Sequence, residues 1–79
     1  MQNVAHALKT ARVRAGFTQK QVAEALGITP QFVNDLEHAR RAFTEKYVPL
    51  LPDSMRYLVA AAMTDEHQAA IERLQMAAQ

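Results

Sequence analysis

The chain has 79 residues, enough for one small domain, and its formal net charge is only +1. It contains no Cys, which excludes a disulfide framework and a thiolate zinc site. Its longest apolar run, residues 58–63, is far too short to span a membrane, and polar residues near the N-terminus interrupt any signal-peptide core. We therefore expect a cytoplasmic protein with a single domain over residues 1–79.

The first predicted element is a helix over residues 3–15. Apolar residues recur at helical spacing on one face up to Ala15, and Gly16 follows at the position where helices commonly end. Arg12 falls on the same side of this helix as Leu8. Its guanidinium therefore needs either a partner inside the protein or a path to solvent.

Residues 18–37, TQKQVAEALGITPQFVNDLE, predict two short helices joined by a tight turn. Thr18 is a candidate N-cap, and Gln21 comes three residues later to complete a capping box. Gly27 follows the apolar face of the first helix directly, as expected for a left-handed residue at a helix end. Pro30 suits the first position of the second helix, because its missing N–H costs nothing there.

This stretch resembles the helix-turn-helix of the lambda-repressor-like and Cro proteins, the Xre-like group. That motif has a small residue early in its first helix, a Gly in the turn and branched apolar residues inside the second helix. The residues in those places are Ala23, Gly27, Ile28, Val33 and Leu36. The resemblance extends from about Leu8 to about Leu51, and it implies an all-α fold, a compact bundle of five or six short helices.

The rest of the chain continues the helical pattern. Pro49 is expected to keep the next helix short or kinked, because proline cannot donate and clashes with a preceding helical turn. A further apolar helix is predicted over residues 55–63. Thr64 is then expected to cap a last helix, about residues 64–78, so that the core spans about residues 3–62. No stretch alternates with period two, and we expect no sheet.

The second helix of the motif carries an outward polar stripe. Gln31, Asn34, Asp35 and His38 follow one another at helical spacing. The side-chain amides suit adenine, whereas Asp35 can accept only from cytosine N4. The resemblance further implies that Gln19 lies against the DNA backbone and that the loop after the second helix crosses a phosphate strand. The candidate DNA-binding residues are Gln19, Lys20, Thr29, Gln31, Phe32, Asn34, Asp35, His38, Arg40 and Arg41.

The charge distribution along the chain is consistent with DNA as the partner. Residues 1–41 hold six Lys or Arg against three Asp or Glu, a balance of +3, and residues 42–79 hold three against five, a balance of −2. The basic excess therefore falls on the part that contains the motif, which favours binding to a polyanion such as double-stranded DNA.

The resemblance also implies a partner for Arg12. An Arg at this place in the first helix pairs, in this family, with a Glu at the end of the second motif helix, here Glu37. The alternative is that Arg12 extends to solvent along its own aliphatic stem.

Helix-turn-helix proteins usually bind two half-sites as dimers, and a core of this size leaves the last helices little to cover. We expect a homodimer that forms through Tyr57, Leu58, Val59, Ile71 and Leu74. The alternative is that these apolar residues cover the domain's own core.

Catalysis is not expected. The three His residues are far apart in the sequence, there is one Ser, and two Gly are too few for a phosphate-binding loop. We predict no enzyme activity, no metal and no cofactor. The resemblance implies a transcriptional regulator, a repressor of a phage, plasmid or mobile-element promoter, with activation left open. The alternative function is an antitoxin or protein-interaction module of a two-gene operon that binds a partner protein.

Overall fold

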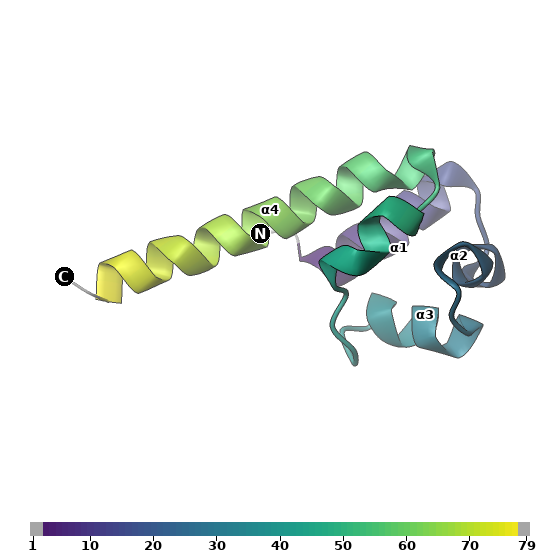
Figure 1. The fold of residues 1–79 in the computed structure, drawn as a ribbon, viewed down its shortest axis with the longest axis horizontal. Coiled ribbons are helices and arrows are strands. Elements are labelled where there is room, and N and C mark those ends of the chain that lie inside the picture. Colours follow the sequence, from purple (N-terminus) through teal and green to yellow (C-terminus); the bar gives the residue numbers. More distant parts are fainter. Residues whose placement is uncertain (1–2, 78–79) are drawn as a thin grey trace.

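The structure is a computed structural model that describes residues 3–77, with four α-helices, one 3-10 helix and no strand among them (Figure 1). The predicted all-α fold with a helix-turn-helix is therefore confirmed. Residue 78, the last of the predicted final helix, lies outside the described residues. In chain order the elements are α1 (Val4–Ala15), α2 (Gln19–Leu26), α3 (Pro30–Glu37), η1 (Glu45–Leu50) and α4 (Asp53–Ala77).

The turns around α2 and α3 have the geometry that local sequence predicts. The Thr18 hydroxyl accepts from the Gln21 N–H at 3.1 Å, and the Thr18 N–H donates to Gln21 Oε1 at 2.9 Å, which completes the capping box. Gly27 ends α2 with a φ of 71°. Thr29 then caps α3 by accepting from the Phe32 N–H at 3.1 Å. Gly27 and Thr29 thus form the tight turn between α2 and α3.

The core lies around α1, which contacts α4 on one side and α3 on the other (Figure 1). The largest fully buried side chains are Leu8, Val22, Val33, Leu36, Leu51, Met55 and Val59. Full burial of one such side chain contributes about 1.5–3 kcal/mol to the free energy of unfolding. These side chains come from every element except η1, so the domain is held together by one shared core.

The last two predicted helices are in fact one helix, α4, and the prediction that Thr64 caps a new helix is wrong. The Thr64 hydroxyl instead donates to the Ala60 carbonyl at 3.1 Å, four residues earlier in the same helix. Residues 53–77 contain no Gly or Pro to end a helix, and their Ala-rich centre has high helix propensity.

The rotation of α4 about its axis also corrects the predicted dimer surface. Val59 is fully buried within the domain, so it cannot contact a second copy. Leu58 is half-buried and packs against the same core, whereas Tyr57 is 85% exposed. The apolar content of residues 55–63 therefore serves mainly the core of the single chain.

η1 contains Pro49 and is only a short 3-10 helix, as predicted from that proline.

Glu66 in α4 connects that helix to the start of α1. Its side chain accepts from the Val4 N–H at 2.7 Å, which satisfies a free N–H at the start of α1 and puts a carboxylate at the positive end of that helix.

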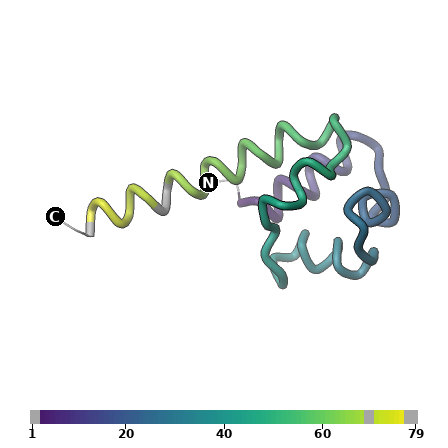
Figure 2. The backbone as a smooth tube through the Cα atoms, viewed as in Figure 1, coloured from purple at the N-terminus to yellow at the C-terminus, as the bar shows by residue number. Residues whose placement is uncertain are grey.

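The C-terminal half of α4 extends away from the rest of the molecule, as Figure 2 shows. The molecule is accordingly 46 Å long but only 22 Å and 19 Å across. None of the helices in the described part of the chain combines the length and apolar character needed to cross a membrane.

Candidate nucleic-acid interface

α3 turns one face to the core and the other to solvent. Val33 and Leu36 are buried, while Gln31 on the opposite face is exposed. Asn34 and Asp35 lie at the edge between the two faces and are partly exposed. A surface helix with amide and carboxylate groups along its outer face has the hydrogen-bonding chemistry needed to read base edges in a major groove.

A buried ion pair fixes α3 against α1. Glu37 Oε2 accepts from Arg12 Nε at 2.6 Å and Glu37 Oε1 accepts from Arg12 Nη2 at 3.2 Å. Arg12 Nη1 also donates to the Phe17 carbonyl at 3.0 Å. The Glu37 side chain is fully buried and that of Arg12 is 14% exposed. This is the pairing implied by the resemblance, and the guanidinium does not extend to solvent.

Gln19 connects this ion pair to the outer face of α3. Its side-chain amide nitrogen donates to Glu37 Oε1 and to Asn34 Oδ1, both at 3.2 Å. Asn34 Oδ1 thus accepts a hydrogen bond from within the protein. Gln19, expected against the DNA backbone, uses both of its amide hydrogens within the protein, so a phosphate contact from this amide would displace one of these bonds.

Asp35 is the meeting point of three candidate DNA-binding side chains. Its Oδ1 accepts from Gln31 Nε2 at 3.2 Å and from Arg40 Nε at 3.0 Å. Arg41 Nε lies 3.6 Å from the other carboxylate oxygen. The hydrogen bond from Arg40, helped by that from Gln31 and by both positive charges, holds the pKa of Asp35 below its ordinary value of 3.8. Asp35 is therefore ionised at neutral pH.

The backbone after α3 brings these arginines to Asp35. Ala39 has a φ of 58°, in the left-handed region that a residue with a Cβ rarely adopts. The turn is closed by the Arg40 N–H, which donates to the Asp35 carbonyl at 2.9 Å, and by the Ala39 N–H, which donates to Leu36 at 3.3 Å. The left-handed residue and these two bonds thus end α3 in a tight turn.

An aromatic group supports the other side of this loop. The guanidinium carbon of Arg41 lies 4.8 Å from the centre of the Phe32 ring. The Phe32 ring packs edge to face on the Tyr47 ring of η1, with 6.4 Å between the ring centroids. The Phe43 ring packs on the same tyrosine, with 5.5 Å between the centroids. Phe32 therefore positions Arg41 beside the outer face of α3.

A helix-turn-helix family model matches residues 8–52, more than half of the chain. The chain belongs to the Xre/lambda-repressor-like helix-turn-helix family. This family membership makes it a DNA-binding helix-turn-helix regulator. The match covers α2, α3 and η1 and ends one residue before α4. The chain has no significant match among curated proteins or among solved structures.

The helix-turn-helix brings most of the predicted residues to one surface. Gln31, Asn34, Asp35, Arg40 and Arg41 lie on α3 or on the loop beside it. Three further predicted residues, two at the ends of α3 and one on α2, are exposed. They are Thr29, whose hydroxyl caps α3, His38, whose Nδ1 lies 2.8 Å from the Asn34 carbonyl, and Lys20 on α2.

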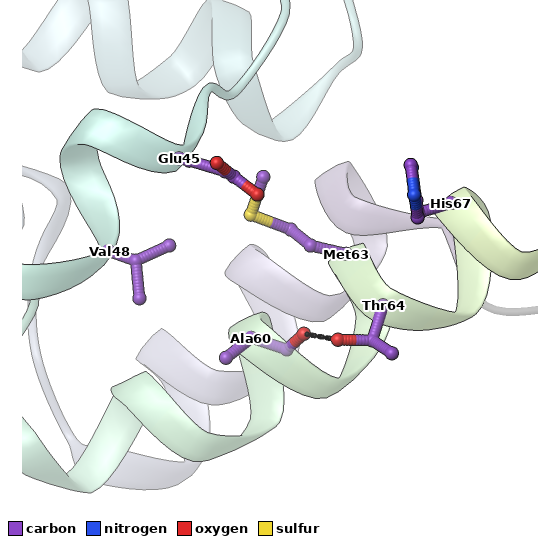
Figure 3. A pocket seen from close by; sticks show the side chains of 6 residues that line it. All are labelled: Glu45, Val48, Ala60, Met63, Thr64 and His67. Atoms are coloured by element: carbon purple, nitrogen blue, oxygen red, sulfur yellow. Dashed lines mark hydrogen bonds between the residues drawn. The ribbon is translucent and has the colours of Figure 1, made fainter.

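Outside the helix-turn-helix, an open pocket of about 420 Å³ lies between η1 and α4 (Figure 3). Sequence reasoning did not find it, because it depends on the continuity of α4, which was predicted as two helices. The absence of Gly and Pro from residues 53–77 is the signal that would have indicated it. The pocket is lined by Glu45, Val48, Ala60, Met63, Thr64 and His67.

Proposed function

We propose that this chain is a sequence-specific transcriptional regulator, a repressor of a phage, plasmid or mobile-element promoter, which binds duplex DNA as a homodimer in the cytoplasm. The observation that carries the proposal is the exposed polar face of α3, flanked by the arginine loop and braced from behind by Gln19. Repression needs only that the bound protein occupies the promoter, so it requires no further catalytic or effector site.

In this proposal each group has a distinct contact. The Gln31 and Asn34 amides bind adenine edges, and Asp35 accepts from cytosine. Arg40 and Arg41 bind phosphates on the strand that crosses the loop. Gln19 and Lys20 at the start of α2 are further candidate phosphate contacts. Thr29, Phe32 and His38 are candidate contacts at the edge of the groove.

The support for a dimer comes from one face of α4. One face of α4 carries five residues at alternating spacings of four and three, the spacing at which one helix packs along another. They are Ala60, Thr64, His67, Ile71 and Leu74. We call this set the α4 stripe. Its first half borders the pocket in Figure 3, and its second half runs along the extended end of the helix, where Leu74 is 72% exposed.

A second copy packed on the α4 stripe would cover its apolar side chains Ile71 and Leu74. Figure 1 shows α4 and α3 on opposite sides of α1, so such a pairing leaves both α3 helices free for DNA. We expect the two half-sites about one helical turn apart on the duplex, roughly 34 Å, the spacing typical of helix-turn-helix dimers. This surface replaces the predicted one in which Val59 took part.

Selection of bound sites from a pool of random duplexes tests the proposal. The expected result is an enriched site of two inverted half-sites about one helical turn apart. A pool without enrichment would refute sequence-specific binding. Enrichment of a single half-site would refute the homodimer but would still support sequence-specific DNA binding.

The alternative function has one observation in its favour. Leu74 and Met76 are 72% and 75% exposed near the end of α4, on different faces of the helix, and both faces suit contact with a different protein. Sedimentation of the purified chain separates the two proposals. A stable monomer at micromolar concentration favours a partner protein such as a toxin, and a dimer favours the homodimeric regulator.

A further inference from the structure

We propose that Asp35 determines specificity at this interface: its carboxylate holds Arg40 and Arg41 away from DNA that lacks a suitably placed cytosine, and releases them to DNA that has one. This inference rests on the proposed DNA-binding function and adds a residue-level basis for discrimination between sites.

Three side chains converge on the Asp35 carboxylate. Two hydrogen bonds reach Oδ1 from Gln31 and Arg40, at 3.2 and 3.0 Å, and Arg41 lies 3.6 Å from Oδ2. The Asp35 side chain is only 19% exposed, whereas those of Arg40 and Arg41 are more than half exposed. The carboxylate is thus enclosed by the same cations that would bind phosphate.

The backbone also enforces this arrangement. Ala39 adopts a left-handed conformation that costs about 1–2 kcal/mol for a residue with a Cβ. The turn it makes returns the Arg40 N–H to the Asp35 carbonyl at 2.9 Å. The approach of the arginine loop to Asp35 is therefore built into the chain direction after α3, not only into flexible side chains.

The Asp35 carboxylate and the DNA phosphates compete for the same two arginines. An arginine that moves to a phosphate leaves the carboxylate, and an uncompensated carboxylate then faces a groove of strongly negative potential. The cytosine N4 amino group can replace the lost donor in the major groove. Thymine presents an acceptor there, and adenine places its N7 acceptor beside its amino group, so neither base compensates equally well.

Discrimination follows from these three points. On a duplex with cytosine in register, Asp35 exchanges arginine donors for a base donor, and Arg40 and Arg41 become free for phosphates. On any other duplex, either the ion pairs stay closed and the phosphate contacts are weak, or they open at an electrostatic cost. Asp35 therefore lowers non-specific affinity more than it lowers specific affinity.

The test compares Asp35→Asn with Asp65→Asn, an identical chemical change at an exposed residue of α4, across α1 from α3. On random duplex at low salt, Asp35→Asn should bind roughly 2- to 30-fold more tightly than wild type, the range expected from two exposed ion pairs. Asp65→Asn should bind as wild type does. Equal affinities for wild type and Asp35→Asn would overturn the proposal.

Site selection provides the second readout. Wild type should enrich cytosine at one position of each half-site, and Asp35→Asn should lose that preference. In wild type, replacing this cytosine by thymine should weaken binding about 5- to 150-fold, the range of one base contact. The same base preferences in both proteins would contradict the proposal.

Removal of both arginines checks the mechanism independently. In an Arg40→Gln/Arg41→Gln background, Asp35→Asn should no longer tighten binding to random duplex, because the cations it releases are gone. An undiminished gain there would mean that the carboxylate acts by simple repulsion, and the holding role would be wrong. Wild type that binds no duplex refutes the proposed function itself, which is distinct from a wild type that binds while Asp35→Asn changes nothing.

Discussion

Glu37 at the end of α3 and Arg12 in α1, 25 positions apart in the chain, form an ion pair with two hydrogen bonds, 2.6 and 3.2 Å long. Because Glu37 is fully buried and also accepts from Gln19, the pair sets the position of α3 relative to both α1 and α2. The DNA-reading face is thus oriented by an interaction on its hidden side.

Glu37→Ala should destabilise the domain strongly. Loss of the carboxylate leaves the Arg12 guanidinium buried without its partner, which costs about 3–5 kcal/mol. Thermal unfolding measures this directly, at about 4–8 °C per kcal/mol for a domain of this size. Glu24→Ala, at an exposed residue of α2, is the matched control and should stay within about 0.5 kcal/mol of wild type. A Glu37→Ala midpoint equal to that of the control would contradict the structural role.

Gln31→Ala and Arg41→Ala should weaken DNA binding in different ways. Gln31 lies on the outward face of α3, so its loss should cost about 1–3 kcal/mol on the selected site and relax the preference at one base position. Arg41 lies on the flanking loop, and its loss should weaken binding to both the selected and a random duplex, more on the selected one where Asp35 releases the arginine, and leave the base preferences unchanged. Binding titrations of both variants on both duplexes decide between these patterns. If the two variants behave identically, the division between base and phosphate contacts is wrong.

Local signals were enough to predict the helix-turn-helix. The Thr18 and Gln21 capping box and the Gly27 helix end each act within a few residues, and the structure contains both. Such signals do not depend on the rest of the fold. The pairing of Arg12 with Glu37 acts across the chain, and the resemblance to the family, not the local pattern, supplied it.

Other sequence signals have two physical meanings, and these were not enough to predict the structure. A Thr hydroxyl can cap a new helix or bond to a carbonyl in the preceding turn, and Thr64 does the second. The burial of Val59 depends on how α4 is rotated against α1, which the sequence pattern of an Ala-rich helix leaves open. The approach of Arg40 to Asp35 depends on the left-handed conformation of Ala39, which alanine rarely adopts.

Ile71→Asp/Leu74→Asp should convert a dimer into a monomer. Both residues belong to the second half of the α4 stripe, and two carboxylates there would prevent close packing of a second copy. Met76→Asp is the matched control, because Met76 is 75% exposed but lies off the stripe. Sedimentation should give a monomer for the double variant and a dimer for wild type and control. A double variant that still dimerises would place the interface elsewhere.

The Asp35 carboxyl should titrate below 3.8, and Arg40→Gln should move its pKa up toward that value, because the hydrogen bond from Arg40 is the main cause of the shift. A group with a lowered folded-state pKa stabilises the fold at pH values above its unfolded pKa, and this stabilisation is lost as pH falls through the folded pKa. The stability difference between wild type and Asp35→Asn should therefore be constant above about pH 4 and shrink below it. Carboxyl chemical shifts followed by NMR across this range test the shift, and an Asp35 pKa unchanged by Arg40→Gln would contradict the contact.

The most direct test of the central claim, that the α3 face and its arginine loop bind duplex DNA, is the affinity of wild type for a selected duplex at several salt concentrations. The logarithm of the binding constant should fall linearly with the logarithm of salt concentration, by about 0.9 for each phosphate neutralised. Lys20, Arg40 and Arg41 from two subunits would give a slope of about −5. Affinity that does not change with salt, or no binding to any duplex, would contradict the account.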